Sequence, residues 1–459
     1  MLTGLLIVLA VLLGFGGLLA WVRPTSSGSA SKRCTRKNLQ GHIQLLVLGD
    51  IGHSPRMRYH AQSIAKHGCR VSIIGYRHHH HDVSDLDHPL ISIIPLPPPP
   101  SYLQTSNKFL FPIFALCKLI HQSWCLWWVL LYRCKPAQWM VVQNPPAAPT
   151  FILAHLVCWL RNTRLVIDWH NFGYSILALK LGKRHPAVQL MKAYEKQFSH
   201  FATAHFCVSK AMARILREEM GIRTPVLVLY DRPASIFQPI TSCELRDNIL
   251  QSLSITSASF QDLKTGRCQL LVSSTSWTSD EDFSILLDAL CQYADVAAST
   301  GDCSLPSLLV VITGKGPLRD LYLSKIAALT AAGKLAQVTI RVAWLNFEDY
   351  ARLLACASLG VCLHTSSSGV DLPMKVVDMF GAGLPVVGWN KYESWPELVT
   401  EGVNGRGFGS AEELASHLVN LLGSDAHSLK KLRDGAIAES RRRWDDEWDP
   451  VAGRLFGMT

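Results

Sequence analysis

The side chains best suited to chemistry lie in one short segment, residues 369–388. Within it, Lys375 and Asp378 follow Pro373 and stand three positions apart. Because proline suits the first turn of a helix, both side chains should share one face of a helix that begins there. A helix N-terminus attracts phosphate through its free N–H groups and its dipole, and a carboxylate one turn further along can accept hydrogen bonds from sugar hydroxyls. The pattern predicts a nucleotide site, with phosphates near Lys375 and a ribose on Asp378.

A third charged side chain, Asp371, lies just before this predicted helix. It could bind the same donor, or it could stabilise the first turn of the helix. Two glycine-containing turns elsewhere could add N–H donors and cations to a diphosphate site, although such turns also serve as ordinary connections. The candidates are Gly52, His53, Ser54 and Arg56 in the first turn, and Gly314, Lys315 and Gly316 in the second.

Three polar side chains at the ends of predicted strands are candidates for a general base. They are Asp50, Asp168 and His170. Open α/β sheets bind their ligands at the carboxyl ends of the strands, where these residues fall. Histidine also has its ordinary pKa near neutral pH, which suits proton transfer. Each of the three could instead bind a ligand or stabilise the fold, and the sequence leaves that choice open.

Strands alternate with helices along most of the chain, which predicts an α/β protein with two Rossmann-like halves that face each other across a cleft. The expected boundaries are residues 42–230 and 231–435, followed by a C-terminal helix over 436–459 that returns to the first half. The G-x-G-x-x-G spacing of dinucleotide-binding folds is absent, so NAD and FAD are not expected.

Composition narrows the class of protein further. The chain has 459 residues and is 48% hydrophobic, which indicates folded domains. Its net charge of +10 suits a partner such as an anionic lipid or a nucleotide. The motifs of nucleic-acid-binding proteins are missing, so nucleic acid is not an expected partner. The 13 cysteines include no C-x-x-C pair, which favours a reducing compartment.

The N-terminus predicts a membrane anchor. Residues 1–22 are almost wholly apolar and just long enough to span a bilayer, and residues 23–41 form a basic linker. Because the positive charge follows the apolar run, the rest of the chain should lie in the cytosol. A cleaved signal sequence is the alternative.

Residues 109–132 form a second apolar stretch, interrupted by Lys118. A lysine near the centre makes full insertion into a membrane costly. We expect a pair of helices on the membrane face, with Trp124, Trp127 and Trp128 at headgroup level, or else a buried core helix.

Four consecutive histidines occupy residues 78–81. Adjacent histidines do not converge easily on one ion, so a solvated loop is favoured over a metal site.

The run from Asp378 to Val386 resembles the donor-binding motif of GT-B glycosyltransferases, with aspartate in place of the usual glutamate. Four motifs together, which begin at Gly49, Asp168, Tyr230 and Gly369, resemble the mannosyltransferases of the dolichol-linked oligosaccharide pathway. Many GT-B enzymes also carry an Arg/Lys pair after the first strand of the second half. Residues 273–280 contain no cation, so that role would fall to Lys315, Lys375 and backbone N–H groups.

The resemblance implies a reaction and a location. Mannose would move from GDP-mannose to GlcNAc2-PP-dolichol with inversion, giving a β1,4 bond on the cytosolic face of the endoplasmic reticulum. It implies no tightly bound cofactor and no essential divalent metal, and other glycosyltransferases of the pathway could be partners. Two alternatives remain: a membrane-bound GT-B enzyme with another donor or acceptor, and a non-catalytic relative that acts as a partner subunit.

Overall fold

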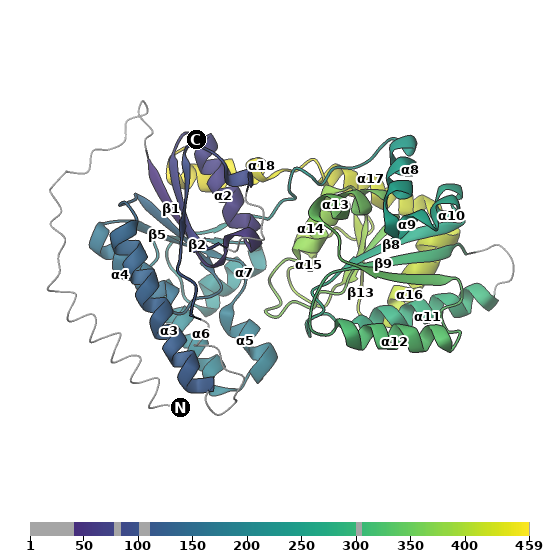
Figure 1. The fold of residues 1–459 in the computed structure, drawn as a ribbon, viewed down its shortest axis with the longest axis horizontal. Helices are drawn as coiled ribbons and strands as arrows, with labels where there is room; N and C mark the ends of the chain where they lie inside the picture. The colour runs from purple at the N-terminus through teal and green to yellow at the C-terminus, as the bar shows by residue number, and fades with distance from the viewer. Residues whose placement is uncertain (1–40, 78–83, 101–110, 300–304, 459) are drawn as a thin grey trace. The chain divides into compact units, whose positions relative to one another are not determined.

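The computed structural model describes residues 41–77, 84–100, 111–299 and 305–458 (Figure 1). The predicted anchor and the four histidines of residues 78–81 lie outside the described residues.

The N-terminal half is built on a seven-stranded parallel sheet with the order β3-β2-β1-β4-β5-β6-β7. Its strands are β1 (His42–Asp50), β2 (Arg70–Tyr76), β3 (Ile91–Pro95), β4 (Trp139–Asn144), β5 (Arg164–Trp169), β6 (Ala204–Cys207) and β7 (Val226–Val228). Its helical elements are η1 (Ile51–His53), α2 (Pro55–Lys66), η2 (Ser84–Leu86), α3 (Phe111–Trp128), η4 (Val129–Arg133), α4 (Thr150–Arg161), α5 (Gly173–Leu181), α6 (Pro186–Ser199), α7 (Lys210–Arg214) and η5 (Ile215–Glu219). The strand order runs outward from the β1–β4 pair in both directions, which makes a switch point of the kind where open α/β sheets bind ligands.

The C-terminal half contains a six-stranded parallel sheet with the order β10-β9-β8-β11-β12-β13. Its strands are β8 (Cys268–Ser274), β9 (Ser307–Thr313), β10 (Val338–Ala343), β11 (Leu359–Cys362), β12 (Val386–Trp389) and β13 (Gly405–Phe408). Its helical elements are α8 (Cys243–Ser252), α9 (Ser254–Ser257), α10 (Phe260–Thr265), α11 (Phe283–Ser299), α12 (Arg319–Ala331), α13 (Phe347–Cys356), α14 (Met374–Gly381), α15 (Trp395–Leu398), α16 (Ala411–Val419), η6 (Asn420–Ser424) and α17 (Ala426–Glu439).

The strands are continuous apolar runs because helices cover both faces of each sheet. In β8, Leu270 and Val272 belong to one core cluster and Leu271 to another, since successive side chains of a strand point to opposite faces. Helices α11 and α12 lie on one side of β8 and β9, and α13 lies on the other (Figure 1). The prediction of two parallel, Rossmann-like sheets is confirmed.

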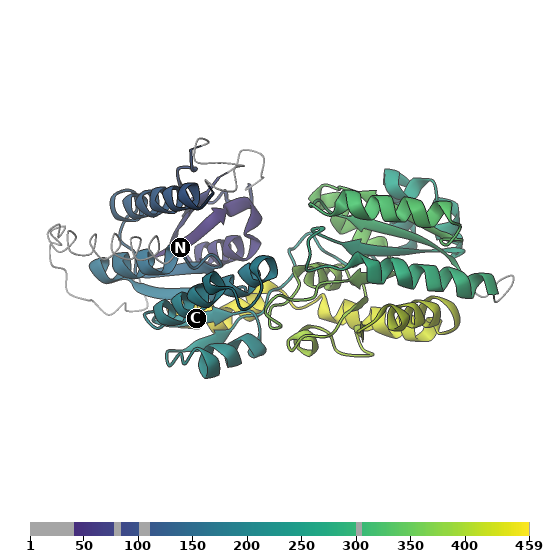
Figure 2. The ribbon, with the colours of Figure 1, turned by 90° about the horizontal axis from the view of Figure 1, so that it is seen from below.

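The end of the chain packs on the N-terminal half. It comprises α18 (Trp444–Trp448), η7 (Asp449–Gly453) and α19 (Arg454–Phe456), which lie against that half in Figure 2. Trp444 and Trp448 are part of the same core cluster as Ile43 and Val71. Trp448 Nε1 also donates to His60 Nδ1 at 2.9 Å, so the C-terminus completes the interior of the first half.

The apolar stretch around residue 120 is one helix, α3, which continues into η4, so the expected pair of helices is wrong. Its proline, at position 112, falls in the first turn, where a missing N–H group is tolerated and no break results. The helix is long and apolar enough to cross a membrane by length and composition alone. Trp127 is buried, whereas Trp124 and Trp128 are exposed.

Candidate active site

The helix predicted to follow Pro373 is present as α14, between β11 and β12. Lys375 lies in its first turn and Asp378 lies one turn further on. A side chain at Gly381, the end of the helix, would overlap Pro233. Helix α14 therefore packs directly on the segment that joins the two halves of the chain.

The Asp378 side chain is half-buried, and it has no hydrogen-bond partner among the residues that the structure describes. Burial and, next, the charge of Asp231 raise the pKa of Asp378 to about 8. This environment favours the protonated form of the carboxyl. Because a carboxyl that is partly shielded from water normally has a partner, Asp378 is suited to a ligand that hydrogen-bonds with it.

The Lys375 ammonium is held by a residue that sequence reasoning missed, the buried Glu281. The Glu281 carboxylate also accepts hydrogen bonds from Thr275 Oγ1 at 2.6 Å and from the Ser276 N–H at 2.8 Å. Glu281 thereby fixes Lys375 beside the loop that follows β8. This is the loop that lacks the cation of many GT-B enzymes, and the Lys375 ammonium lies next to it.

Asp371 organises the loop before α14. Its carboxylate accepts hydrogen bonds from Ser366, from Ser368 Oγ at 3.1 Å and from His364 Nε2 at 2.9 Å. Burial opposes ionisation, but these donors and the nearby imidazole hold the pKa of Asp371 below its ordinary value. With its oxygens engaged in this way, Asp371 is placed to shape the loop.

The turn around Lys315 depends on its two glycines. A Cβ at Gly314 would overlap the carbonyl of Thr275, and one at Gly316 would overlap the carbonyl of Ser276. The turn and the loop after β8 therefore touch backbone to backbone. Lys315 Nζ lies 4.3 Å from the ring centroid of Trp344, a favourable cation–π contact that holds the ammonium at the surface.

Arg56 and Asp168 form a buried ion pair. Arg56 Nε and Nη2 donate to the two oxygens of Asp168 at 2.8 and 2.9 Å, and Arg56 Nη1 donates to Asp231 at 2.8 Å. Arg56 is 3% exposed and Asp168 is 0% exposed. Burial alone would raise the pKa of Asp168, but Arg56 and the neighbouring histidines hold it well below its ordinary value. These positions favour a structural role over the predicted diphosphate contact of Arg56 and the predicted base role of Asp168.

His170, at the end of β5, directs Nε2 toward Asp168 Oδ2 at 3.1 Å. Since the carboxylate can only accept, the proton of a neutral His170 resides on Nε2, which leaves Nδ1 able to take a proton. The imidazole is partly exposed, with 24% of its side chain accessible. His60 also donates to Asp168, because its own Nδ1 accepts from Trp448. Of the three predicted base candidates, His170 has the geometry of an oriented base.

Asp50 and the first glycine turn form a local cap. Asp50 Oδ1 accepts from the Gly52 N–H at 3.1 Å, Asp50 Oδ2 lies 3.2 Å from His53 Nδ1, and Ser54 Oγ donates to the Asp50 carbonyl. A carboxylate that engages this turn competes with an anion for the same N–H groups.

The segment after His170 is held by a second residue that the sequence did not single out, Glu195. It accepts from the Gly173 N–H at 2.8 Å and from Asn144 Nδ2 at 3.2 Å. Burial raises the pKa of Glu195 to about 7. No signal in the sequence points to Glu195, because the burial of this glutamate of α6 is evident only in the folded chain.

Two hydrogen bonds connect the segment after His170 to the loop before α14. Asn171 Nδ2 donates to Ser367 Oγ at 3.1 Å, and Ser175 Oγ lies 3.1 Å from the same oxygen. The segment that follows the candidate base His170 is therefore hydrogen-bonded to the loop that Asp371 organises.

Carboxylates at Asp-x-Asp spacing, which bind metal in some glycosyltransferases, occur beside this site at residues 280–282. Their side chains diverge: Asp280 lies 3.7 Å from His364 Nδ1, Glu281 pairs with Lys375, and Asp282 accepts from the Ser284 N–H. In the folded chain, the carboxylates at this spacing therefore do not point to one common metal position.

Comparisons with known proteins agree with this architecture. Residues 52–231 match the family described as glycosyl transferase 4-like domain, and residues 270–424 match glycosyl transferases group 1. The chitobiosyldiphosphodolichol β-mannosyltransferase of Arthroderma benhamiae is 65% identical over 373 residues, which cover 81% of this chain and 83% of that protein. An Arabidopsis thaliana protein named UDP-glycosyltransferase TURAN is 39% identical, with 91% of this chain and 97% of that protein covered.

Solved structures extend the likeness to the fold. HepE from Anabaena, in a crystal structure with UDP and glucose, superposes with a TM-score of 0.61 at 16% identity, covering 91% of this chain and all of that one. At this identity the likeness concerns the fold alone, which is the two-sheet architecture of GT-B glycosyltransferases.

Proposed function

Because the chain belongs to the family of chitobiosyldiphosphodolichol β-mannosyltransferases, we propose that it moves mannose from GDP-mannose to dolichol-diphosphate-linked chitobiose. The product is Man-β1,4-GlcNAc2-PP-dolichol, formed with inversion. The observation that carries the donor assignment is α14, where Lys375 is held at the first turn and the Asp378 carboxyl lacks a protein partner one turn on. The catalytic halves face the cytosol at the endoplasmic reticulum, anchored by residues 1–22.

On the donor side, Asp378 binds the ribose and Lys375 binds the diphosphate together with the free N–H groups of α14. A protonated Asp378 both donates to and accepts from ribose hydroxyls, which suits a diol. Glu281 keeps Lys375 beside the loop after β8, where the cation of many GT-B enzymes is missing. Lys315 is a weaker candidate for the same role, because it rests on Trp344.

On the acceptor side, His170 is the general base. Its Nδ1 takes the proton of the acceptor hydroxyl as that oxygen attacks the anomeric carbon and the bond to GDP breaks. One displacement inverts the centre, so no covalent intermediate forms. Asp168 holds the imidazole through Nε2 and stabilises the imidazolium that results, while Arg56 keeps Asp168 ionised.

A turnover assay with GDP-mannose and a short-chain lipid-linked chitobiose tests the proposal. We expect mannose transfer that GDP inhibits at a lower concentration than UDP does. Stronger inhibition by UDP would favour the second candidate, a UDP-sugar donor, which the name of the Arabidopsis relative suggests. Tight GDP binding without any transfer would contradict catalysis and favour a partner subunit.

A further inference from the structure

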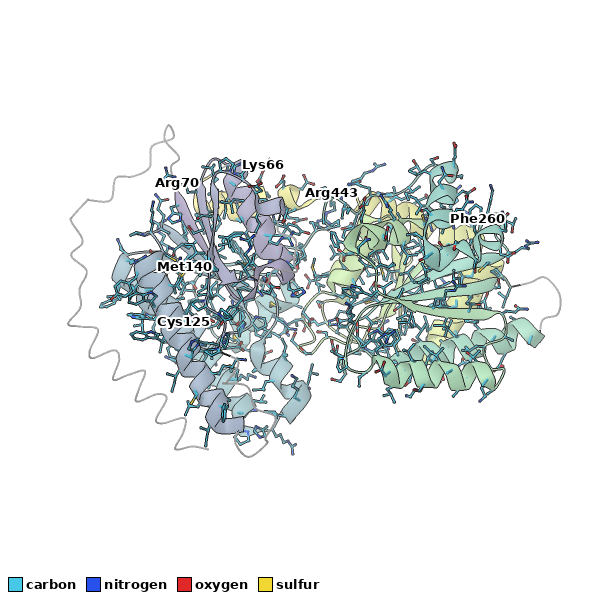
Figure 3. All side chains as sticks on the ribbon, in the orientation of Figure 1. Lys66, Arg70, Cys125, Met140, Phe260 and Arg443 are labelled. Atoms are coloured by element: carbon cyan, nitrogen blue, oxygen red, sulfur yellow. The ribbon has the colours of Figure 1, made fainter. Side chains whose placement is uncertain are left out.

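The outer face of α3 is apolar, where a helix on the surface of a water-soluble domain would be polar. Its exposed apolar side chains recur at intervals of three or four positions, so they form one stripe along the helix. The α3 stripe consists of Ile113, Cys117, Ile120, Trp124, Trp128 and, in the following turn, Tyr132. Ile113 and Tyr132, at its two ends, are each 59% exposed. The stripe therefore runs the length of the helix (Figure 3, where Cys125 marks α3).

Two polar side chains of α3 are satisfied within the protein. Gln122 Nε2 donates to the hydroxyl of Tyr76 at 3.2 Å, and Ser123 Oγ donates to the carbonyl of Leu119 at 2.7 Å. The buried side of α3 and of the turn after it is apolar too, with Leu126 and Leu130 in the interior, so the helix lacks the polar outer face of an ordinary surface helix. Lys118, beside the stripe, has a stem long enough to bring its ammonium to a polar boundary.

The part of the chain that contains the stripe is strongly basic. Residues 88–194 contain ten Lys or Arg residues and a single carboxylate, the buried Asp168. Exposed Arg133 and Lys135 follow the end of the stripe. Arg161 of α4 donates to the carbonyls of Leu131 and Cys134, so α4 flanks this end. An apolar line bordered by positive charge complements an anionic lipid surface.

We propose that the α3 stripe lies in the boundary between headgroups and acyl chains of an anionic membrane, with the helix parallel to the membrane plane. Trp124, Trp128 and Tyr132 then sit where amphipathic rings are favoured. A second copy of the chain is a poorer occupant, because a symmetric contact would bring two positive surfaces together. The proposal deepens the proposed function, since it brings the N-terminal half to the surface that holds a lipid-linked acceptor.

Two cysteines that are exposed among the described residues allow a direct test in the full chain. Cys117 lies on the stripe, and Cys243 lies on α8 in the C-terminal half. Each in turn is labelled with an environment-sensitive fluorophore after the other is changed to serine, together with the remaining accessible cysteines. The protein is reconstituted in phosphatidylcholine–phosphatidylserine vesicles whose acyl chains carry bromine. We expect the Cys117 label to be quenched several-fold more than the Cys243 label. Equal quenching overturns the proposal, as does a Cys117 label that is shielded from water but not quenched, because a protein then covers the stripe.

A pair of variants separates this proposal from the enzymatic one. Trp124→Glu with Trp128→Glu should abolish the quenching at Cys117 and reduce turnover of a vesicle-embedded acceptor by about tenfold. Turnover of a short-chain acceptor in detergent should stay at the parental level. Leu245→Glu with Leu321→Glu, at exposed positions of the C-terminal half, is the matched control. Unchanged quenching in the tryptophan variant overturns the membrane contact, whereas absence of all mannose transfer in the parent overturns only the proposed function.

Discussion

Two carboxyl groups near the segment that joins the halves have opposite properties. Burial acts on both to raise the pKa, yet the pKa of Asp168 is well below its ordinary value and that of Asp378 is raised to about 8. Asp168 has Arg56 and two histidines as partners, whereas Asp378 has the repulsion of Asp231 and no hydrogen-bond partner within the described residues. Partners, more than depth, decide the charge of a buried acid. Within the part of the chain that the structure describes, Asp168 is held by charged partners and Asp378 is not.

Asp231 connects the two centres. It accepts a hydrogen bond from Arg56 at 2.8 Å, and its charge opposes the ionisation of Asp378. Substitution of either Asp168 or Asp378 therefore tests how the partners of a buried carboxyl decide its charge.

The largest effect should come from Asp168→Ala. The variant leaves Arg56 buried with one partner fewer, so the free energy of unfolding should fall by about 3–5 kcal/mol. Urea unfolding measures it. Asp320→Ala, which removes an exposed acid beside Arg319, is the control and should change stability by no more than about 0.5 kcal/mol. A loss as small as the control's would mean that the buried pair contributes no more than a surface pair.

Next in size is His170→Ala, which removes the oriented base but not the buried pair beneath it. The turnover number should fall by about 10²–10⁴-fold, the usual contribution of a general base, with an unchanged unfolding midpoint. His200→Ala, in the same half but outside the site, should retain parental activity. If the turnover number falls by less than about tenfold, His170 is not the general base, and Asp50 or a water molecule would take the proton.

A smaller effect is expected from Asp378→Ala. Loss of a charged or strongly polar hydrogen bond to the ribose should weaken GDP binding by about tenfold, measured by calorimetry, without loss of stability. The parent should also bind GDP more tightly than the 2′,3′-dideoxy nucleotide, and the variant should not distinguish them. If GDP binds both proteins equally well, Asp378 does not contact the ribose.

A separate effect concerns pH and stability. The folded pKa of Asp378, about 8, exceeds its ordinary value of 3.8, so the folded state holds a proton that the unfolded state has lost. Stability should therefore fall as pH rises between these values, and this contribution disappears in Asp378→Asn. The stability advantage of the variant over the parent should grow from pH 5 to pH 8 in urea unfolding. An advantage that stays constant with pH would place the ionisation elsewhere.

Local patterns predicted several elements of the fold correctly. Proline, lysine and aspartate at helical spacing predicted the helix α14. Apolar runs followed by glycine turns predicted strands of both sheets. Local patterns failed for α3, where a pair of helices was expected and one helix is found. Pro112 lies in the first turn of α3, and a proline breaks a helix only beyond that turn. Local patterns also predicted that Arg56 contacts the diphosphate, whereas its side chain is buried against Asp168. The sequence does not show whether a cation at the start of a helix points to solvent or to the interior. Glu281 and Glu195 were missed because neither stands in a recognisable motif.

By itself, the sequence determined the alternation of strands and helices, the family resemblance and the placing of Lys375 and Asp378 on one helical turn, because these depend on residues close together in the chain. The tertiary structure decided which acids are charged and which side chains are accessible. Arg56 and Asp168 are 112 positions apart, and His60 and Trp448 are 388 apart. The pKa and exposure of a group depend on such neighbours, which only the folded chain brings together.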